Sequence, residues 1–538
     1  MSPLPSRARA GEIAVKGAHL GLRQFALAPE QRAARRLATQ ARERVAPPAA
    51  GAPVVAFLTP RDWAAHVQWE GMIAQALRLR GADVRFITCG GGLEICDRAN
   101  TWEAPPMPCT TCTRYVHGSV EAHGFPHVAI ADAWQAADPL PWPEIDEVSG
   151  PDLRSVQWEG LALGELVDIP VKWFLMAAQL DDDPLAPITH RRFLRSARRV
   201  VVGLESALDR LQPDVVILCN GLFFFEALCW ELCRRRGIDV VTYERGFIKE
   251  TLVFRRGKAA CLLDMDAMWS RYGDVPLSDD EGVELDDYLG ARSRGERTID
   301  RFWIRPQFET PDRHRPGRLV GLFTNLTWDS AVIGQEIGFP TLTSWVAAAI
   351  ELFGERPDDE LLIRIHPAEV KLPGKQTREP IAAFIAERFP TLPPNVRIVS
   401  ADDPTSSYPI MEACDAGLVF SSTTGLELAL RGKPVIVAGA SHYRGKGFTV
   451  DVSSPEEFVA RIDEVLVDPD AHRPDVELVR RYAHLFFFKA PIGTPAVEEH
   501  VLGLARITAH DLADLAPGRN VDVDRICDGI LGGGDFSV

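Results

Sequence analysis

The sequence lacks any apolar run long enough to span a membrane, for which a helix needs about 18–20 residues. The nearest candidate is 215–233, which polar side chains at Asn220, Glu226 and Glu231 interrupt. This pattern indicates a strand, a turn and a helix rather than a transmembrane segment. The N-terminus also lacks the continuous apolar core of a secretory signal. These absences predict a cytoplasmic protein.

An overall excess of basic residues is missing too. Lys and Arg number 59 against 75 Asp and Glu, so the formal net charge is −16. A general nucleic-acid-binding protein needs a basic surface to meet phosphates, and this composition argues against one. Apolar residues make up 46% and charged residues 25%, which is ordinary for a soluble globular protein and argues against extensive disorder. The length, 538 residues, is enough for several domains.

The first 50 residues carry a net charge opposite in sign to that of the rest of the chain. This segment holds nine Lys or Arg and three Glu, a net of +6, which leaves −22 on the remainder. The interpretation that we favour is a helix-rich extension packed on the body of the protein. The alternative is a basic arm that contacts an anionic membrane, which would place the protein peripherally at the inner membrane.

Cysteine is scarce for this length, and no secretory signal accompanies the ten residues. We therefore expect reduced thiols rather than disulfides. Four of them follow the spacing C-x6-C-x12-C-x2-C, whose final two-residue gap is typical of a zinc site. Four thiolates suffice for a closed structural zinc site, and an iron–sulfur cluster or unrelated thiols are the alternatives. The predicted ligands are Cys89, Cys96, Cys109 and Cys112.

Short apolar runs alternate with amphipathic helical patterns along most of the chain. One series begins with VVAFLT at 54–59, and the pattern restarts with LVGLFTN at 319–325. Such alternation predicts two α/β domains, each with a doubly wound parallel sheet, that face a cleft. We place the boundary between them in the charged, irregular stretch 305–318. The expected segments are a basic extension at 1–50, an N-terminal Rossmann-like domain at 51–310, a C-terminal Rossmann-like domain at 311–470, and C-terminal helices with a flexible tail at 471–538.

Polar residues follow the predicted strands of the C-terminal domain, at the sheet edge where ligands bind. His366 and Pro367 end the apolar strand ELLIRIHP, so the imidazole is expected at that edge, as a ligand or as a capping or packing residue. A run of four hydroxyl residues lies between the next strand but one and a helix. Free N–H groups and the positive end of the helix dipole make this an expected phosphate site, although a single hydroxyl would suffice as an ordinary cap. The run is Ser421, Ser422, Thr423 and Thr424, followed by Gly425.

Further candidates for donor binding lie on the same edge. Asn325 ends the strand LVGLFTN, and Glu427 stands in the first turn after the hydroxyl run. Glu427 is a candidate acceptor of hydrogen bonds from ribose hydroxyls, or merely a favourable charge near a helix start. Tyr443, Arg444 and Lys446 lie on a Gly-containing loop that suits a phosphorylated or carboxylated ligand, with a solvated loop as the alternative.

Together these motifs resemble the donor half of a GT-B glycosyltransferase, and most closely the bacterial capsule polysaccharide biosynthesis family, over roughly 319–451. Bacterial sialyltransferases of this fold share a His-Pro and a Ser-Ser motif, matched here by His366-Pro367 and Ser421-Ser422. CDP-glycerol glycerophosphotransferases are similar in a hydroxyl pair, a following Glu and a GKPV-like strand, matched by Ser421-Ser422, Glu427 and the sequence GKPV at 432–435.

The resemblance implies a glycosyltransferase that needs no metal for its chemistry. Its expected donor is a nucleotide sugar, most readily a CMP-linked acidic sugar, because the His-Pro and hydroxyl motifs hold the cytidine monophosphate in those families. Arg444 and Lys446 would then bind the sugar carboxylate. The expected acceptor is a cell-surface polysaccharide or glycolipid. The chain departs from retaining relatives at Val419, where many of them carry a second Glu.

The catalytic base is expected in the N-terminal domain. The Asp-Asp-Gly-like stretch at 279–282 sits in a charged, irregular segment and is not a convincing source. Asp62 and His66 follow the first strand, and Glu244 follows a later one. Their structural alternatives are a helix cap for Asp62, a core position for His66 and an ion pair for Glu244. His366 would stabilise the leaving phosphate.

Two other functions remain open at this stage. A UDP-sugar 2-epimerase uses the same two-domain fold, but its usual Ser-Gly-Gly phosphate loop is replaced here by Ser-Thr-Thr-Gly. A non-catalytic nucleotide-sugar-binding subunit of a polysaccharide assembly complex is the alternative of a different class.

Overall fold

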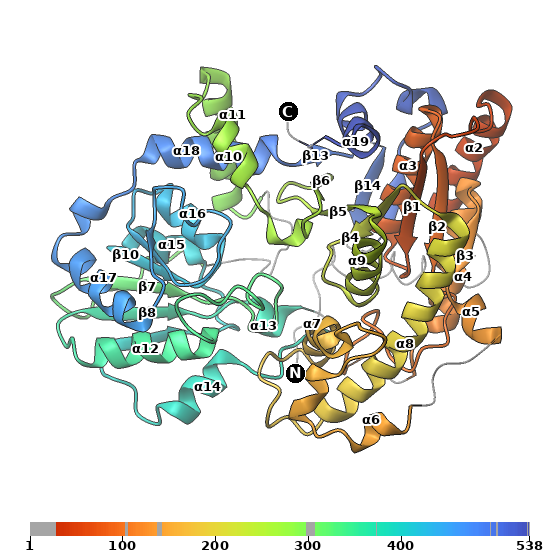
Figure 1. The fold of residues 1–538 in the computed structure, drawn as a ribbon. Coiled ribbons are helices and arrows are strands. Elements are labelled where there is room, and N and C mark those ends of the chain that lie inside the picture. The colour runs from red at the N-terminus through yellow and green to blue at the C-terminus, as the bar shows by residue number, and fades with distance from the viewer. Residues whose placement is uncertain are drawn as a thin grey trace.

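The computed structural model describes residues 28–102, 106–136, 142–296, 307–372, 374–494, 496–501, 504–534 and 536. Two lobes lie side by side, each built on its own sheet (Figure 1). The parallel strand orders, β3-β2-β1-β4-β5 in one lobe and β9-β8-β7-β10-β11 in the other, are those of Rossmann-like sheets. The predicted fold class is thereby confirmed. Within the described residues, no helix has the length and apolar character that a membrane crossing requires.

The N-terminal sheet has seven strands in the order β13-β6-β5-β4-β1-β2-β3. Strand β1 is central, because Val55 pairs with Val84 on one side and with Val215 on the other. Two antiparallel strands, β6 and β13, extend one edge. The strands are β1 (Val54–Thr59), β2 (Asp83–Thr88), β3 (His127–Ala129), β4 (Val215–Cys219), β5 (Asp239–Arg245), β6 (Thr251–Arg256) and β13 (Ile492–Gly493).

Helices cover both faces of this sheet. Successive β1 residues alternate between the two cores, with Val55 and Phe57 in one and Ala56 and Leu58 in the other. The first core is completed by α2 (Pro29–Arg44), α3 (Ala64–Leu79), α4 (Cys109–His123) and α19 (Val521–Gly532). The second is completed by α5 (Ala131–Ala136), α6 (Glu144–Glu147), α7 (Leu163–Leu175), α8 (Ala186–Leu211) and α9 (Phe224–Arg236).

The C-terminal sheet has six parallel strands in the order β12-β11-β10-β7-β8-β9. Its strands are β7 (Leu319–Phe323), β8 (Glu360–Arg364), β9 (Val396–Val399), β10 (Ala416–Val419), β11 (Val435–Val437) and β12 (Val450–Asp451). One face packs on α12 (Leu342–Gly354), α14 (Ile381–Arg388) and α17 (Pro455–Val467). The other packs on α15 (Ser407–Ala413), α16 (Thr424–Ala429) and α18 (Val476–His484), and the short α13 (Ala368–Lys371) follows β8.

Two helices that precede the predicted boundary pack in the C-terminal lobe. These are α10 (Asp266–Tyr272) and α11 (Asp279–Ser293), which lie beside α18 (Figure 1). Leu285 and Tyr288 of α11 share one buried core with Leu319 and Phe323. The domain boundary expected at 305–318 therefore does not hold for these helices, because their apolar faces are buried against the C-terminal sheet.

The charged stretch at 278–287 is regular, although its composition predicted an irregular segment. The Ser278 hydroxyl accepts a hydrogen bond from the backbone N–H of Glu281 at 3.3 Å, and the Glu281 carboxylate accepts one from the Ser278 N–H at 3.0 Å. This reciprocal capping box starts α11. The signal is visible in the sequence as Ser-x-x-Glu, but the five other acidic residues of 278–287 made the stretch look irregular.

The part of the basic N-terminal extension that forms α2 is helical and packs on the body of the protein, as predicted. Ala34, Leu37 and Ala41 are buried against the N-terminal core. Gln31 donates hydrogen bonds from its amide to the backbone oxygen of Tyr115 and to the hydroxyl of Ser119, at 3.2 and 3.0 Å. The arginines of α2 are exposed on its outer side. The rest of the predicted extension, 1–27, lies outside the described residues.

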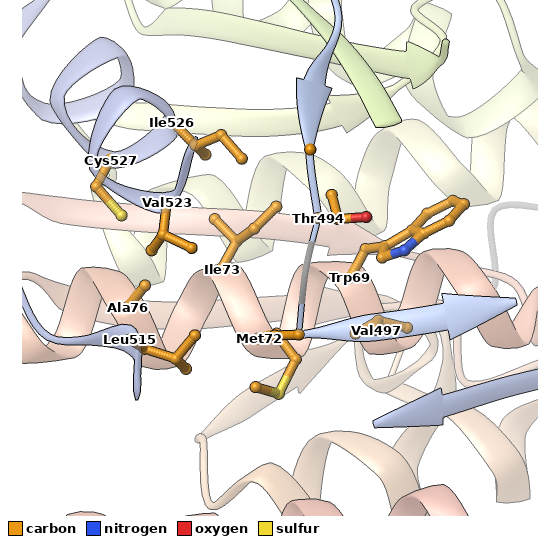
Figure 2. Close-up of a pocket in the computed structure, with 12 residues that line it drawn as sticks. Trp69, Met72, Ile73, Ala76, Thr494, Val497, Leu515, Val523, Ile526 and Cys527 are labelled. Carbon is orange, nitrogen blue, oxygen red and sulfur yellow. The ribbon is translucent and has the colours of Figure 1, made fainter. Parts of the chain in front are cut away.

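After α18 the chain returns to the N-terminal lobe. It adds β13, a hairpin of β14 (Val497–Val501) and β15 (Leu504–Ile507), and α19. Met72 and Ile73 of α3 face Val523 and Ile526 of α19 across a small apolar cavity (Figure 2). The tail predicted to be flexible is packed at Phe536, which stacks on Phe254 with ring centroids 5.2 Å apart.

Candidate functional site

The carboxyl ends of the C-terminal strands bring most of the predicted donor-binding residues to one edge. The His366 N–H donates to the Thr324 hydroxyl at 3.0 Å, which ties the end of β8 to the end of β7 beside Asn325. The Ser421 hydroxyl donates to the backbone oxygen of Ala331, which ties the end of β10 to the loop after β7. These loops flank the point where the strand order reverses, the usual ligand position in such sheets.

The environment of His366 fixes its protonation state. Its Nδ1 accepts a hydrogen bond from the Ala368 N–H at 3.1 Å, so the neutral ring carries its proton on Nε2. Burial, reinforced by the nearby Arg364, lowers the pKa of His366 to about 4. The imidazole is therefore neutral at physiological pH and has the Nε2–H as its donor.

The hydroxyl run forms a compact turn at the start of α16. The Ser422 hydroxyl accepts from the Thr424 N–H at 3.2 Å and lies 3.1 Å from the Thr424 hydroxyl. Thr423 caps no backbone N–H of α16 with its side chain. Beneath the turn, the Tyr443 hydroxyl donates to the Ser422 backbone oxygen at 2.6 Å. A Cβ at Gly425 would collide with that tyrosine hydroxyl, so glycine is required there.

Three predicted donor ligands hold the fold instead of facing an open site. Tyr443 is fully buried. The Arg444 guanidinium donates to the backbone oxygens of Val437 and Val452, at 3.0 and 2.9 Å. The Lys446 ammonium pairs with Asp266 of α10. The expectation that Arg444 and Lys446 hold a sugar carboxylate is not met by this geometry, because their charges are already engaged within the protein.

Glu427 is also paired, with a residue that sequence reasoning missed. Its carboxylate accepts from the Arg292 guanidinium of α11 at 3.0 Å, and both side chains are nearly buried. Arg292 could not be found from the sequence, because it lies 135 positions away in the segment assigned to the other domain. The pair fastens α11 to the start of α16.

In the N-terminal lobe, Glu244 at the end of β5 faces the other domain. Its carboxylate accepts hydrogen bonds from the Asn220 amide at 2.6 Å and from the Arg245 N–H at 2.8 Å. Burial raises the pKa of Glu244, and the carboxylate of Asp329, in the loop after β7, adds to that shift. Asn220 adopts a left-handed backbone conformation with φ of 63°, which is uncommon outside glycine and often marks functional positions.

His66 lies in the first turns of α3, held by a chain of buried polar groups. Its Nδ1 is 3.3 Å from the Tyr243 hydroxyl and 3.4 Å from the Cys219 sulfur. The Tyr243 hydroxyl donates to Glu70 at 2.6 Å, and burial raises the pKa of Glu70 to about 7. Burial lowers the pKa of His66, as do the nearby Arg245 and Arg61. Asp62 is engaged differently, because it accepts hydrogen bonds from the Arg98 guanidinium.

A buried charge cluster beside these residues also escaped the sequence analysis. Arg61 follows β1, is 3% exposed and pairs with Asp97 at 2.9 Å and with Glu226 of α9. Its guanidinium also lies over the rings of Trp63 and Phe223, at 4.3 and 5.0 Å. The three charged residues come from three separate segments of the chain, so no local sequence motif could predict the cluster.

The predicted zinc ligands lie between the end of β2, which Cys89 follows, and the first turn of α4, which holds Cys109 and Cys112. In the part of the chain that the structure describes, no group of three or more His, Cys, Asp or Glu is arranged to hold a metal ion. Burial raises the pKa of Cys89 to about 12 and also raises those of Cys96 and Cys112. Zinc binds thiolates and would itself deprotonate such thiols, and the structural zinc site stays a prediction.

An aromatic row joins the two lobes. The rings of Trp63, Phe223 and Trp173 follow one another with centroids 5.1 and 5.3 Å apart, and Trp173 meets Trp328 of the C-terminal lobe at 5.6 Å. The indole N–H groups of Trp173 and Trp328 are buried without a hydrogen-bond partner in the described residues. The row runs from the loop after β1 to the loop after β7, and so connects the two lobes.

Comparison with known proteins matches the C-terminal lobe to a protein family. Residues 307–472 match the model of the capsule polysaccharide biosynthesis protein family. This confirms the resemblance that the motifs predicted, over about a third of the chain, and the matched stretch contains the whole donor edge from Asn325 to Glu427. No curated protein matches the chain.

Several solved structures are distantly similar. KpsC of Thermosulfurimonas dismutans, described as a beta Kdo 2,4 transferase, is 16% identical, covers 56% of this chain and 87% of its own, and gives a TM-score of 0.35. The glycosyltransferase SnogD of Streptomyces nogalater is 15% identical over 81% and 96%, with a TM-score of 0.25. The UDP-GlcNAc 2-epimerase of Neisseria meningitidis is 10% identical over 80% and 96%, with a TM-score of 0.23. The strand orders of this chain, and not these likenesses, establish its fold.

Proposed function

We propose that this protein is a metal-independent glycosyltransferase that moves a sugar from a CMP-linked donor to a cell-surface polysaccharide or glycolipid. The observation that supports it best is the donor edge itself. Asn325, His366 and the 421–424 hydroxyls follow three strands of one parallel sheet, inside the stretch matched by the capsule polysaccharide family model. Opposite this edge stands a carboxylate of raised pKa, Glu244.

In the proposed reaction, the bond between the anomeric carbon and the donor phosphate breaks. An acceptor hydroxyl attacks that carbon and gives its proton to Glu244, while the phosphate leaves with the bonding electron pair. A neutral His366 donates from Nε2 to the leaving phosphate, and N–H and hydroxyl groups of the 421–424 turn add further donors. Glu244 suits the role of base because both its oxygens are held in place and its raised pKa favours proton uptake.

The residue types support a donor with one phosphate. Arg444, Lys446 and Arg292 are engaged with protein groups, so the edge offers mainly neutral donors. A single phosphate monoester needs fewer compensating cations than a diphosphate. This reasoning favours CMP over UDP or GDP as the leaving nucleotide. In this proposal, Arg444 and Lys446 stabilise the fold and do not bind the sugar.

Incubation with radiolabelled CMP-, UDP- and GDP-sugars in the presence of capsular oligosaccharides tests the function. Transfer of label to the oligosaccharide from the CMP-sugar is the expected result. Interconversion of a UDP-sugar with its 2-epimer would support the epimerase alternative instead. Tight nucleotide-sugar binding without either reaction would support the non-catalytic alternative. Glu244→Gln, which keeps shape and loses the base, is the matched inactive control.

A further inference from the structure

A cavity of about 750 Å³ lies between the two lobes, apart from the donor edge. One wall is the segment from Ala178 to Pro184, which follows α7, and the other is formed by 327–343 of the C-terminal lobe. Contacts across it join the lobes, because Arg378 donates two hydrogen bonds to Asp183, at 2.6 and 3.1 Å. The cavity therefore exists only while the two lobes are docked.

Polar groups without partners line or border this cavity. Thr327 is 5% exposed and lines it, and its hydroxyl has no hydrogen-bond partner in the described residues. Next to it, Trp328 is buried with an unpartnered indole N–H, and the ring packs on Trp173 of the other lobe. Buried polar groups are normally satisfied, so such a group marks a place that a ligand or water completes. The lining itself combines hydroxyls, such as that of Thr327, with apolar side chains, such as those of Val332 and Ile333, and this mixture suits a saccharide, which has both polar and apolar faces.

The charges of the lining are unequal. Five carboxylates face three cations, Arg154, Lys172 and Arg378. Asp183 is neutralised by Arg378, and Arg154 lies 3.8 Å from Asp181. Arg154 and Lys172 also both contact Asp168 outside the cavity. Two acids of the lining, Asp182 and Glu336, make no ion pair within the described parts of the chain. The field in the cavity therefore disfavours an anionic ligand and suits a neutral or positively charged one.

The position of the cavity connects it to the proposed chemistry. Thr327 is two residues beyond Asn325 of the donor edge, and the same loop carries Asp329, whose charge acts on Glu244. The cavity and the proposed catalytic base therefore both adjoin the loop after β7.

We infer that this cavity is the acceptor subsite and takes a saccharide of neutral or amino sugars rather than an acidic one. The inference rests on the proposed function, and it adds the chemical class of the acceptor. An acidic sugar added to that chain would be disfavoured in the cavity, which favours release of the product.

Tetrasaccharides of glucosamine, N-acetylglucosamine and galacturonic acid serve as cationic, neutral and anionic probes, with affinity measured by calorimetry. We expect the first two to bind at least about tenfold more tightly than the third, and Thr327→Val to weaken both by about tenfold, the scale of one hydrogen bond. The double variant D182K/E336K should reverse the preference. Its matched control, E355K/D358K, changes the same charge on exposed positions outside the cavity lining and should behave like the wild type.

Equal binding of all three probes, or an unchanged preference in D182K/E336K, would overturn the inference. So would the absence of saccharide binding in a protein that CMP still stabilises against heat. If the wild type neither bound nucleotide nor turned over a CMP-sugar, the proposed function itself would be refuted. Thr327→Val is isosteric, and its thermal midpoint without ligand shows whether the variant is folded.

Discussion

The two Rossmann-like lobes present different chemistry at the same edge of the same kind of sheet. The C-terminal edge offers hydroxyls, backbone N–H groups and a neutral imidazole at Asn325, His366 and 421–424. The N-terminal edge is dense in charge, with Arg61, Asp62 and Glu244 within or just after strands β1 and β5. Most of those charges are paired in the buried interior. Glu244 differs, because neutral groups and a backbone N–H hold it.

This contrast suggests a division of labour. Neutral donors can stabilise charge that develops on a leaving phosphate without a prior desolvation penalty of their own. A carboxylate whose charged form is disfavoured by burial is instead suited to taking a proton. Two lobes of the same fold can thus present hydrogen-bond donors on one side and a proton-accepting carboxylate on the other. Three substitutions and one measurement of nucleotide binding can break or sharpen the comparison.

Glu244→Gln should have the largest effect. We expect turnover to fall by about 10³-fold, the middle of the range for losing a general base. Glu244 must be ionised to act, and its pKa is raised, so wild-type activity should be lost as the pH falls through a value above the ordinary 4.3 or so for Glu. Rates measured across pH on the wild type give this acid limb. The variant His66→Gln should show the same fall in rate at low pH as the wild type. If that fall disappeared only in His66→Gln, the base would be His66.

Arg61→Met should chiefly lower stability. It leaves Asp97 and Glu226 buried without their cation, and breaking a buried pair in this way costs about 3–5 kcal/mol in free energy of unfolding. Urea denaturation followed by circular dichroism measures the loss. The triple variant R61M/D97N/E226Q, which removes all three charges, should recover much of it. A single variant as stable as the wild type would show that the cluster is not a balanced charge network.

His366→Ala should reduce turnover by about 10²-fold, the scale of one lost transition-state donor. His366→Gln keeps an N–H donor at similar reach and should recover part of the rate. The melting temperature should change little, since the side chain lies after β8 rather than in the core of the sheet. A variant with wild-type turnover would exclude His366 from the donor site.

The smallest expected effect is the selective stabilisation by nucleotides. At 100 times its dissociation constant, a ligand adds about 2.7 kcal/mol to the stability of the folded state. We expect CMP to raise the thermal midpoint more than UDP or GDP at equal concentration. The shift should be smaller in His366→Ala, which loses one of several donors, and should persist unchanged in Glu244→Gln, which belongs to the other lobe. Stabilisation by UDP or GDP alone would overturn the CMP assignment and leave the proposal of a glycosyltransferase intact.

The sequence predicted local features well and contacts across long separations poorly. The alternation of strands and helices gave the two sheets, and the short motifs after β8 and β10 gave His366 and the hydroxyl run, because each signal is contained in a few neighbouring residues. The Ser278–Glu281 capping box was equally local, yet it was passed over among the charges. The helix α11 that it starts then joined a core whose other members lie far along the chain.

The amino-acid sequence by itself determined the fold class, the helical character of α2 and the place of the proposed donor edge, since periodicity, turn residues and strand-end motifs act over short distances. Tertiary structure alone decided which charges are available. It engaged Arg444, Lys446 and Glu427 with protein groups, buried Arg61 with two acids, and placed Asp329 near Glu244. The physical reason is that solvation and pairing depend on what packs around a group, and those neighbours come from distant parts of the chain.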